Sequence, residues 1–276
     1  MWYNGSMTEK GQERSERVER AIEVATKAHE GQKRKSGEPY IIHPLAVLKI
    51  VEDWGMDEDT CVAAVLHDTV EDTELTLEDI RKEFGESVAK LVDGVTKMGK
   101  VRKGMKDIDT YLPETKDNFL RLLVATGSDI RVLIIKLADR MHNLRTLSAL
   151  PPEQQKKIAK ESLEVFAPLA DRLNMGRLRV EMADVAFSYV EPARYQFLQN
   201  LIDERNAQGE KKMKKIQGEV AEALLREKIK FEISGRVKSV YSLHKKLAKY
   251  NQNIEEIYDL TAIRIIVSDI TDCYLV

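Results

Sequence analysis

The sequence has few of the features of disulfide-rich, membrane-spanning or secreted proteins. Its 276 residues include only two cysteines, Cys61 and Cys273, which are far apart and outside any CxxC pair. This argues against a disulfide scaffold or a zinc knuckle, and Cys61 is expected in the core. No apolar run approaches the roughly 20 residues needed to span a bilayer, and the N-terminal residues lack a signal-peptide core. We therefore expect a cytoplasmic protein.

An excess of charge of either sign is also absent. Lys and Arg number 44 and Asp and Glu 46, so the formal net charge is −2. This balance gives no overall attraction to nucleic acids or to membrane surfaces. Hydrophobic residues make up 43% of the chain, enough for the cores of one large domain or two ordinary ones. A globular protein that recognises its partners locally is expected.

The densest group of ionisable side chains lies in Thr60–Glu74, TCVAAVLHDTVEDTE. The apolar residues recur at helical spacing without Gly or Pro, which predicts one partly buried helix. On that helix His67 lies one turn from Glu71, and Asp68 one turn from Asp72. Three carboxylates this close repel strongly when partly desolvated, and a metal ion would neutralise them. Taken singly, each of these residues also fits an ordinary solvated helix end.

A second group lies in Asp129–Leu150. Its apolar residues continue at helical spacing beyond a short run that could itself be a buried strand, so a helix is predicted. Asp139 and Asn143 are one turn apart on this helix, and His142 and Arg145 adjoin them.

Two features precede these helices. The segment Gln32–Pro39 is a basic loop that can present cationic groups to a phosphate or a base edge, or can be a solvated turn. His43 lies in an apolar run just before Pro44, which fits the first turn of a helix. A lone histidine there is more often a core residue than a ligand. Nevertheless, His43, His67, Asp68 and Asp139 together form a mixed set that suits manganese, iron or zinc better than calcium, with His142 as an alternative to Asp139.

Spacing, caps and composition predict the other elements. The stretch Thr96–Pro113 has three Gly or Pro, five Lys or Arg and no sustained period, which indicates a long mobile loop over or beside the site. Phe231–Ser234 and Ala262–Val267 have strand composition, and a helix-like segment separates them. Further helices are predicted over Glu9–His29, Leu45–Trp54 after a proline, a capped Thr76–Glu83, Ser87–Val95, Asn118–Ala125, Ser239–Tyr250, residues 153–205 and a charged connector, Gly209–Lys230.

The order H…HD…D resembles that of the HD-type metal-dependent phosphohydrolases. The segments GQKRKSGEPYIIHP, HDTVED and KLADRMHNLRTL resemble the hydrolase motifs of the RelA/SpoT homologue family, and GRVKSVYSLHKK and IYDLTAIRIIV are similar to its first synthetase motifs. The resemblance implies a mainly α fold: an all-helical HD-domain phosphohydrolase followed by the start of an α/β nucleotidyltransferase-like domain. The implied boundaries are 7–195 for the hydrolase, 196–230 for connecting helices and 231–276 for the truncated synthetase.

The resemblance also implies roles for individual residues. Mn²⁺ would be held by His43, His67, Asp68 and Asp139, while Glu71 and Asp72 would act on the water. The implied reaction is that of a guanosine-3′,5′-bis(diphosphate) 3′-pyrophosphohydrolase in stringent-response alarmone turnover, which converts (p)ppGpp to GDP or GTP plus pyrophosphate. The substrate would be bound by Arg34 and Lys35 at the guanine, by Ser36 beside them, and by Asn143, Arg145 and Thr146 in the nucleotide pocket.

For the synthetase the match is partial. Arg236 and Lys238 would bind ATP phosphates, and Asp259 would be a Mg²⁺ ligand, but the later strand with the second acidic residue is absent. GTP pyrophosphokinase activity is therefore expected of the full-length family member and not of this chain. Ribosome contact would need the family's C-terminal regions, and no membrane or direct nucleic-acid partner is expected.

Two other functions fit part of the pattern. One is an HD phosphohydrolase for a different nucleotide, against which the RKSG segment and the synthetase motifs argue. The other is a regulatory module that holds a guanine nucleotide without cleaving it. Loss of the HDxxED pattern would have indicated such a module, and the sequence retains HDTVED from His67 to Asp72.

Overall fold

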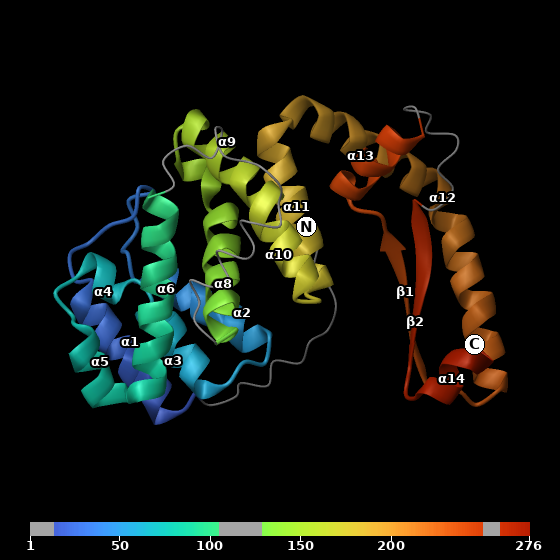
Figure 1. Ribbon diagram of the computed structural model, residues 1–276. Coiled ribbons are helices and arrows are strands. Elements are labelled where there is room, and N and C mark those ends of the chain that lie inside the picture. Colours follow the sequence, from blue (N-terminus) through green and yellow to red (C-terminus); the bar gives the residue numbers. More distant parts are fainter. Residues whose placement is uncertain (1–13, 105–128, 251–259) are drawn as a thin grey trace. The chain divides into compact units, whose positions relative to one another are not determined.

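The computed structural model describes residues 14–104, 129–250 and 260–276, and it divides into two compact units, Met1–Pro152 and Glu153–Val276 (Figure 1). The fold is mainly helical, as predicted. In the described part of the first unit, the helices are α1 Glu16–Ala28, α2 Ile42–Asp53, α3 Glu58–Leu66, α4 Thr69–Asp72, α5 Leu77–Phe84, α6 Glu86–Gly104 and α8 Arg131–Arg145, followed by a 3₁₀ turn, η1 Leu147–Ala149.

Helix α3 is the centre of the first unit. It packs against α1, α2, α6 and α8, and all seven residues from Thr60 to Leu66 are buried, Cys61 among them. This run is apolar almost all round, which is typical of a helix enclosed by other helices. Asp57 caps α3 by accepting a hydrogen bond from the Thr60 amide at 2.8 Å, so the helix begins where the sequence indicates. Because α3 is enclosed, its C-terminal end at Leu66 lies in the middle of the first unit.

Several predictions about helix ends in this unit were wrong. The first helix begins at Glu16 after its cap Ser15 and not at Glu9, and the second begins at Ile42 and not at Leu45. Thr60–Glu74 is not one helix, because α3 ends at Leu66 and α4 begins at Thr69. The stretch from Thr96 to Gly104 is helical and continues α6, so the predicted loop does not begin at Thr96. Buried apolar side chains at Val95 and Met98 hold this part of α6 in place, although Gly99 and Gly104 lower its local helix propensity.

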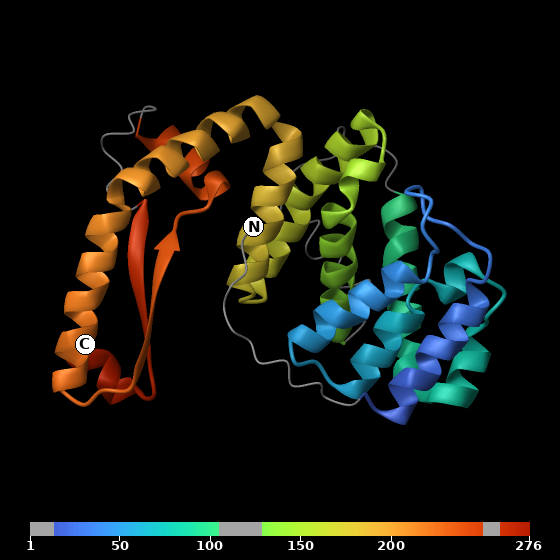
Figure 2. The same ribbon diagram turned by 180° about the vertical axis from the view of Figure 1, so that it is seen from behind.

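Other predictions in the first unit were confirmed within the described residues. Within Asp129–Leu150, the predicted helix is α8, which spans Arg131–Arg145 and is followed by the 3₁₀ turn Leu147–Ala149. Thr76 and Asp79 form the capping box at the start of α5. The predicted helix Asn118–Ala125, residues 105–113 and residues 9–13 lie outside the described residues. In Figure 2 the packing of α1 and α2 beside α3 is seen from behind.

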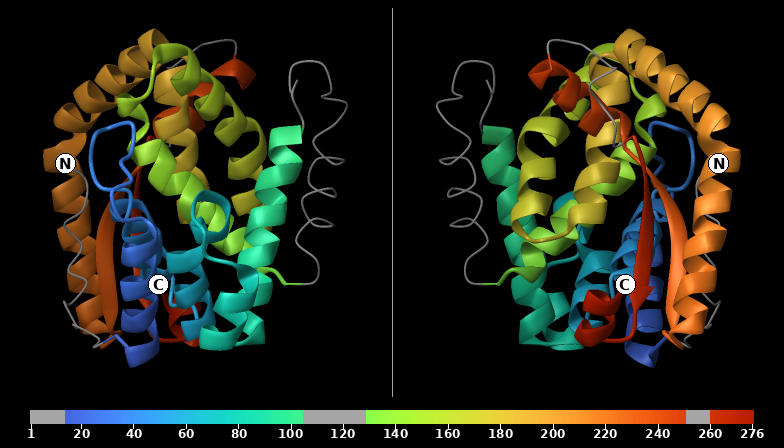
Figure 3. Two further views of the ribbon diagram at one scale, coloured as in Figure 1. Left: turned by 90° about the vertical axis from the view of Figure 1, so that its left-hand side faces the viewer. Right: turned by 90° about the vertical axis from the view of Figure 1, so that its right-hand side faces the viewer.

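The second unit combines a helical hairpin with a small sheet. Its elements are α9 Pro152–Glu161, a π-helical segment η2 Ser162–Phe166, α10 Ala167–Arg172, α11 Gly176–Val190, α12 Pro192–Arg226, β1 Phe231–Val237, α13 Val240–Lys249, β2 Thr261–Val267 and α14 Ile270–Leu275. The strands pair antiparallel, with Phe231 opposite Val267, and α12 lies along β1 (Figure 3). The two predicted strands and the helix between them are thus confirmed.

A hydrophobic core joins α11, α12 and α13 within the second unit. Its buried members include Phe187, Leu198 and Leu243. Asp184 of α11 caps α13, because its carboxylate accepts hydrogen bonds from the amides of Val240 and Tyr241 at 3.2 and 2.9 Å. The start of the α/β region is therefore packed on the helices that precede it. Among the described residues, no helix is both long and apolar enough to cross a bilayer.

Candidate metal centre

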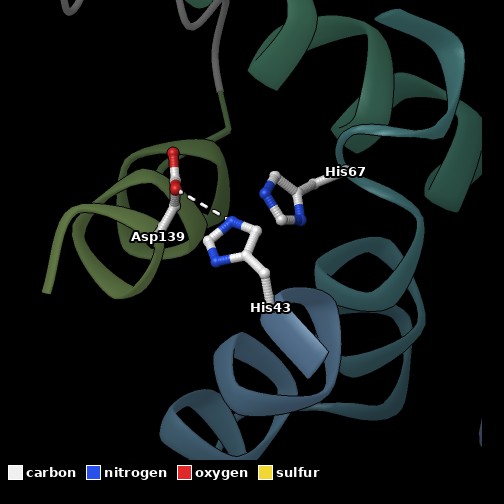
Figure 4. Close-up of side chains that lie close together, drawn as sticks. All are labelled: His43, His67 and Asp139. Carbon is white, nitrogen blue, oxygen red and sulfur yellow. Dashed lines mark ion pairs between the residues drawn. The ribbon is translucent and has the colours of Figure 1, made fainter. Parts of the chain in front are cut away.

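Two helices and one helix break bring the predicted metal ligands together. His43 lies in the first turn of α2, His67 and Asp68 lie between α3 and α4, and Asp139 lies on α8. Figure 4 shows His43, His67 and Asp139 facing one another, and one possible ligand atom from each lies within 4.8 Å of the others. We call His43, His67, Asp68 and Asp139 the metal-ligand cluster.

Asp68 completes the cluster through one carboxylate oxygen. Its Oδ2 lies 3.1 Å from Nε2 of His67 and 3.5 Å from Nε2 of His43, and Nε2 of His43 lies 3.3 Å from Oδ1 of Asp139. The side chains of His43 and His67 are almost fully buried, and those of Asp68 and Asp139 are 17% and 13% exposed. The cluster is therefore a largely desolvated set of two imidazoles and two carboxylates.

The hydrogen bonds of His67 show that the cluster suits a cation. Its Nδ1 lies 2.8 Å from the carbonyl oxygen of Ala64, and because a carbonyl only accepts, this nitrogen carries the hydrogen. In the neutral ring the lone pair is then on Nε2, which is buried and makes no hydrogen bond. A bare nitrogen beside carboxylate oxygens is satisfied by a divalent ion with nitrogen and oxygen ligands.

The charges of the cluster support one another electrostatically. Burial alone would raise the pKa of Asp68 and of Asp139, but the imidazoles of His67 and His43 hold the pKa of Asp68, and Lys136 with the same imidazoles holds the pKa of Asp139, well below the usual range. Burial alone would lower the pKa of His67, yet the carboxylates raise it. For His43 burial prevails and the pKa is lowered. The carboxylates are thus ionised at neutral pH, and a proton competes with a cation at His67.

Tyr40 is a site residue that the sequence reasoning missed. Its hydroxyl lies 2.8 Å from Oδ2 of Asp68 and 3.0 Å from Oδ2 of Asp72, and its single hydrogen serves one of them at a time. Burial and the two carboxylates raise the pKa of Tyr40, so it remains a donor. It links the metal-ligand cluster to Asp72, which is exposed, while Glu71 beside it is half-buried. Tyr40 begins the largely apolar segment YIIHP, so nothing in the local sequence indicated a role for its hydroxyl.

A second layer supports Tyr40 and Asp72. The ring of His29 stacks on that of Tyr40 with centroids 4.6 Å apart, and its Nδ1 lies 2.8 Å from Oε1 of Gln32. Gln32 in turn donates from Nε2 to the backbone carbonyl of Asp72 at 2.8 Å. The end of α1 and the basic loop therefore hold α4 in place.

Asp139 is oriented by two neighbours on its own helix. Nζ of Lys136 lies 3.1 Å from Oδ2, and Nδ2 of Asn143 donates to Oδ1 at 2.6 Å. Spacings of three and four residues place these groups on one side of α8. The spacing made Asn143 a candidate, and the same signal could have identified Lys136, which the sequence reasoning did not consider.

The basic loop reaches the cluster through one of its predicted substrate-binding residues. Arg34 donates from Nη2 to Oδ1 of Asn143 at 3.1 Å and to Oγ1 of Thr146 at 3.4 Å, and its Nη1 lies 3.2 Å from Nδ1 of His142. His142 is directed at the ring of His43 and is not among the three residues whose ligand atoms converge. The geometry thus favours Asp139 over His142 as the ligand from α8.

The remaining predicted binding residues lie at the surface or outside the described residues. Lys35 and Ser36 are exposed on the loop, where Ser36 donates to Glu38 at 3.0 Å, and Arg145 is exposed on α8. In the second unit, the backbone amide of Lys238 donates to the carbonyl of Leu260 at 2.8 Å. Asp259 and the side chain of Arg236 lie outside the part of the chain that the structure describes.

Comparisons with known proteins identify both parts of the chain. Residues 21–176 match the HD domain model, and residues 235–276 match the region found in RelA/SpoT proteins. The HD match alone covers more than half of the sequence and includes every member of the metal-ligand cluster.

Relatives with similar sequences carry three kinds of name. The chain is 46% identical over 257 residues to a GTP pyrophosphokinase of Streptomyces coelicolor, covering 93% of this chain and 30% of the relative. It is 42% identical over 263 residues to a guanosine-3′,5′-bis(diphosphate) 3′-pyrophosphohydrolase of Aquifex aeolicus, covering 95% and 37%. It is 40% identical over 261 residues to the bifunctional (p)ppGpp synthase/hydrolase SpoT of Escherichia coli, covering 94% and 36%.

The chain spans about a third of the length of these relatives. A solved structure of a metazoan orthologue of SpoT that hydrolyses ppGpp is 29% identical, with alignment of 63% of this chain and 95% of that chain and a TM-score of 0.48. The chain therefore belongs to the HD-domain family, whose model matches residues 21–176, and its residues 235–276 match the region found in RelA/SpoT proteins.

Proposed function

We propose that this chain hydrolyses the 3′-pyrophosphate of (p)ppGpp with a divalent metal ion, for which we propose Mn²⁺. The observation that carries this proposal is the buried metal-ligand cluster beside the exposed carboxylate of Asp72 and the loop residue Arg34. Relatives named as pyrophosphohydrolase and as synthase/hydrolase, at 42% and 40% identity over nearly all of this chain, support the substrate.

The residues of this chain divide the work by position. His43, His67, Asp68 and Asp139 would hold the ion, which supplies Lewis acidity toward water and a phosphate oxygen. Asp72, exposed at the edge of the cluster and held by Tyr40, would accept a proton from the attacking water, and Glu71 would help to orient that water. Water adds to the phosphorus bonded to the ribose 3′-oxygen, the bond to that oxygen breaks, and the 3′-oxygen takes up a proton.

The basic loop would position the nucleotide. Arg34 would pack on and bind the guanine with Lys35 and Ser36, and Asn143, Arg145 and Thr146 would line the pocket. Arg34 is already held by Asn143 and Thr146, so little of its side-chain entropy is lost when a ligand binds. In the same proposal residues 7–195 form the hydrolase domain, 196–230 connect, and 231–276 begin the synthetase domain. The cytoplasmic location stays a prediction.

The direct test is hydrolysis of ppGpp by the purified chain with Mn²⁺, with and without EDTA. Release of GDP and pyrophosphate that EDTA abolishes is expected. The substitution Asp72→Asn should lower kcat by about 10²- to 10⁴-fold, the usual contribution of a positioned proton-transfer group. Glu74→Gln is the matched control, because this exposed carboxylate lies two residues from Asp72 and outside the site.

Two outcomes would reject the proposal. No turnover by a protein that binds Mn²⁺ and ppGpp would identify a binding module that holds the nucleotide without cleaving it. Faster turnover of a nucleotide without a 3′-pyrophosphate, such as dGTP, would identify an HD phosphohydrolase of another specificity. In either case the metal-ligand cluster would need a different assignment of substrate.

A further inference from the structure

His142 lies between two functional side chains, Arg34 of the basic loop and His43 of the metal-ligand cluster. Its Nδ1 is 2.7 Å from Nδ1 of His43 and 3.2 Å from Nη1 of Arg34. The residue is 8% exposed, and its ring is 4.8 Å from that of His43, centroid to centroid. One nitrogen atom therefore serves both neighbours, away from bulk water.

The available donors determine where the hydrogen atoms lie. A guanidinium only donates, so the contact with Arg34 requires a lone pair on Nδ1 of His142. Two bare nitrogens would repel at 2.7 Å, so the hydrogen between the rings belongs to Nδ1 of His43. A neutral imidazole carries one hydrogen, which leaves the lone pair of His43 on Nε2. That atom is the one that faces Asp139 at 3.3 Å.

His67 has the same tautomer, with the hydrogen on Nδ1 and the lone pair on Nε2, but its hydrogen-bond partner is a backbone group. Its Nδ1 donates to the backbone carbonyl of Ala64, which can never become a donor. His43 instead depends on another imidazole, and an imidazole nitrogen accepts only while it is unprotonated. The ligand state of His43 is thus set by a side chain on α8, whose own state is set by Arg34.

We propose that His142 is a positioning residue: it accepts the Nδ1 hydrogen of His43 and thereby presents Nε2 to the metal, and Arg34 holds His142 in the tautomer that can accept. The inference rests on the proposed function of the metal-ligand cluster and does not depend on which nucleotide is cleaved. Its consequence is that the nucleotide loop and the metal centre are coupled. Groups that hydrogen-bond to metal-bound histidines commonly change metal affinity 10- to 100-fold when removed.

The first test measures Mn²⁺ affinity by titration calorimetry without any nucleotide. His142→Leu fills a similar volume without an acceptor and should raise the Kd for Mn²⁺ by about 10- to 100-fold. His142→Asn places an amide oxygen near the position of Nδ1 and should restore most of the affinity. Unchanged affinity in His142→Leu, or no better affinity in His142→Asn, would overturn the proposal. A loss in both variants as complete as in Asp139→Ala would make His142 a ligand instead.

A second measurement needs no variant at His142 and holds even if His142→Leu does not fold. Nitrogen NMR of the metal-free wild-type protein labelled at histidine should show His43 protonated at Nδ1 and bare at Nε2. A spectrum with His43 protonated at Nε2 alone would reject the proposed hydrogen positions. Neither the Mn²⁺ titration nor the NMR measurement uses substrate. The role of His142 can therefore be tested even if the protein does not hydrolyse ppGpp.

The part played by Arg34 is tested by a matched pair of substitutions. Arg34→Met removes the donor to His142 and should weaken Mn²⁺ binding, by a smaller factor than His142→Leu. It should have no further effect in the His142→Leu background, because the two residues act through one chain of hydrogen bonds. Lys33→Met, which removes an exposed cation next to Arg34 on the same loop, should leave the Mn²⁺ affinity unchanged. Equal losses in Lys33→Met and Arg34→Met would reject the coupling.

Discussion

The two segments that supply most of the metal-ligand cluster present their side chains in different ways. α8 is continuous, and His142 and Asn143 lie three and four residues after Asp139, so an unbroken helix places each of them beside Asp139. His67 and Asp68 are adjacent, and adjacent side chains on an unbroken helix point about 100° apart. The helix ends at Leu66 and restarts at Thr69, which allows both side chains to reach the same point. A motif of adjacent ligands thus indicates a break, whereas spaced ligands indicate a helix.

The sharpest test of this comparison removes one ligand from each segment. His67→Ala and Asp139→Ala should each weaken Mn²⁺ binding by more than about 100-fold, beyond the loss expected for an outer-shell residue. Calorimetric titration with Mn²⁺ measures both, and Glu74→Gln, an exposed carboxylate outside the site, is the control. Retention of metal by Asp139→Ala together with its loss in His142→Ala would transfer the α8 ligand to His142.

A smaller effect is expected for Tyr40, which contacts Asp68 at the helix break and Asp72, the proposed catalytic carboxylate. Tyr40→Phe keeps the ring stacked on His29 but removes the donor to Asp68 and Asp72. A hydrogen bond to a charged group contributes about 1.5–3 kcal/mol, so kcat for ppGpp should fall by roughly 10- to 100-fold. The thermal midpoint should change little by comparison. Wild-type kcat in Tyr40→Phe would show that α4 is held without the tyrosine.

The packing of α8 against α6 can be disturbed at Gly94, which lies on α6 against Val132 of α8. A Cβ added at Gly94 would lie 2.7 Å from Cγ2 of Val132, so Gly94→Ala should destabilise the first unit by about 1–3 kcal/mol, as overpacking does. Gly218→Ala on α12 meets open space and should instead stabilise its helix by about 0.5–1 kcal/mol. Thermal unfolding measures both effects. If Val132→Ala does not relieve the Gly94→Ala defect, the clash is not its cause.

The smallest loss of stability is expected at the start of α3. Asp57 accepts hydrogen bonds from the amide and hydroxyl of Thr60 and pairs with Arg131 at 3.2 Å. Burial alone would raise its pKa, but these partners hold the pKa below its usual value. Asp57→Ala should cost about 1 kcal/mol at pH 7, a typical N-cap loss. Asp57→Asn, which keeps a cap, should lose less.

The pH dependence of this effect has a definite sign. Because the pKa of Asp57 is lower in the folded state, its carboxylate contributes stability above the unfolded value near 4. That contribution disappears as the pH falls through the folded value. The stability gap between wild type and Asp57→Ala should therefore narrow from pH 7 to pH 3 in urea unfolding. A gap that is constant over this range would exclude an ionised Asp57 as the source of the stabilisation.

Local patterns in the sequence were sufficient for elements that their own residues stabilise. The capping box of Thr76 and Asp79, the cap at Asp57 and the spacing on α8 all concern contacts within four residues. The two strands were recognisable from their strand-like composition, and the structure shows that they pair with each other. Continuation of α6 to Gly104 was missed, because burial of apolar side chains outweighs weak local propensity.

By itself, the sequence determined the kinds of group at the site and most of the helices that carry them. It contained His43, His67, Asp68 and Asp139, and the order of these residues indicated one metal. Only the tertiary structure decided the break after Leu66, the hydroxyl of Tyr40 between two carboxylates and the place of His142 against His43. These features join residues up to 99 positions apart, and such contacts depend on how helices pack and not on any local spacing.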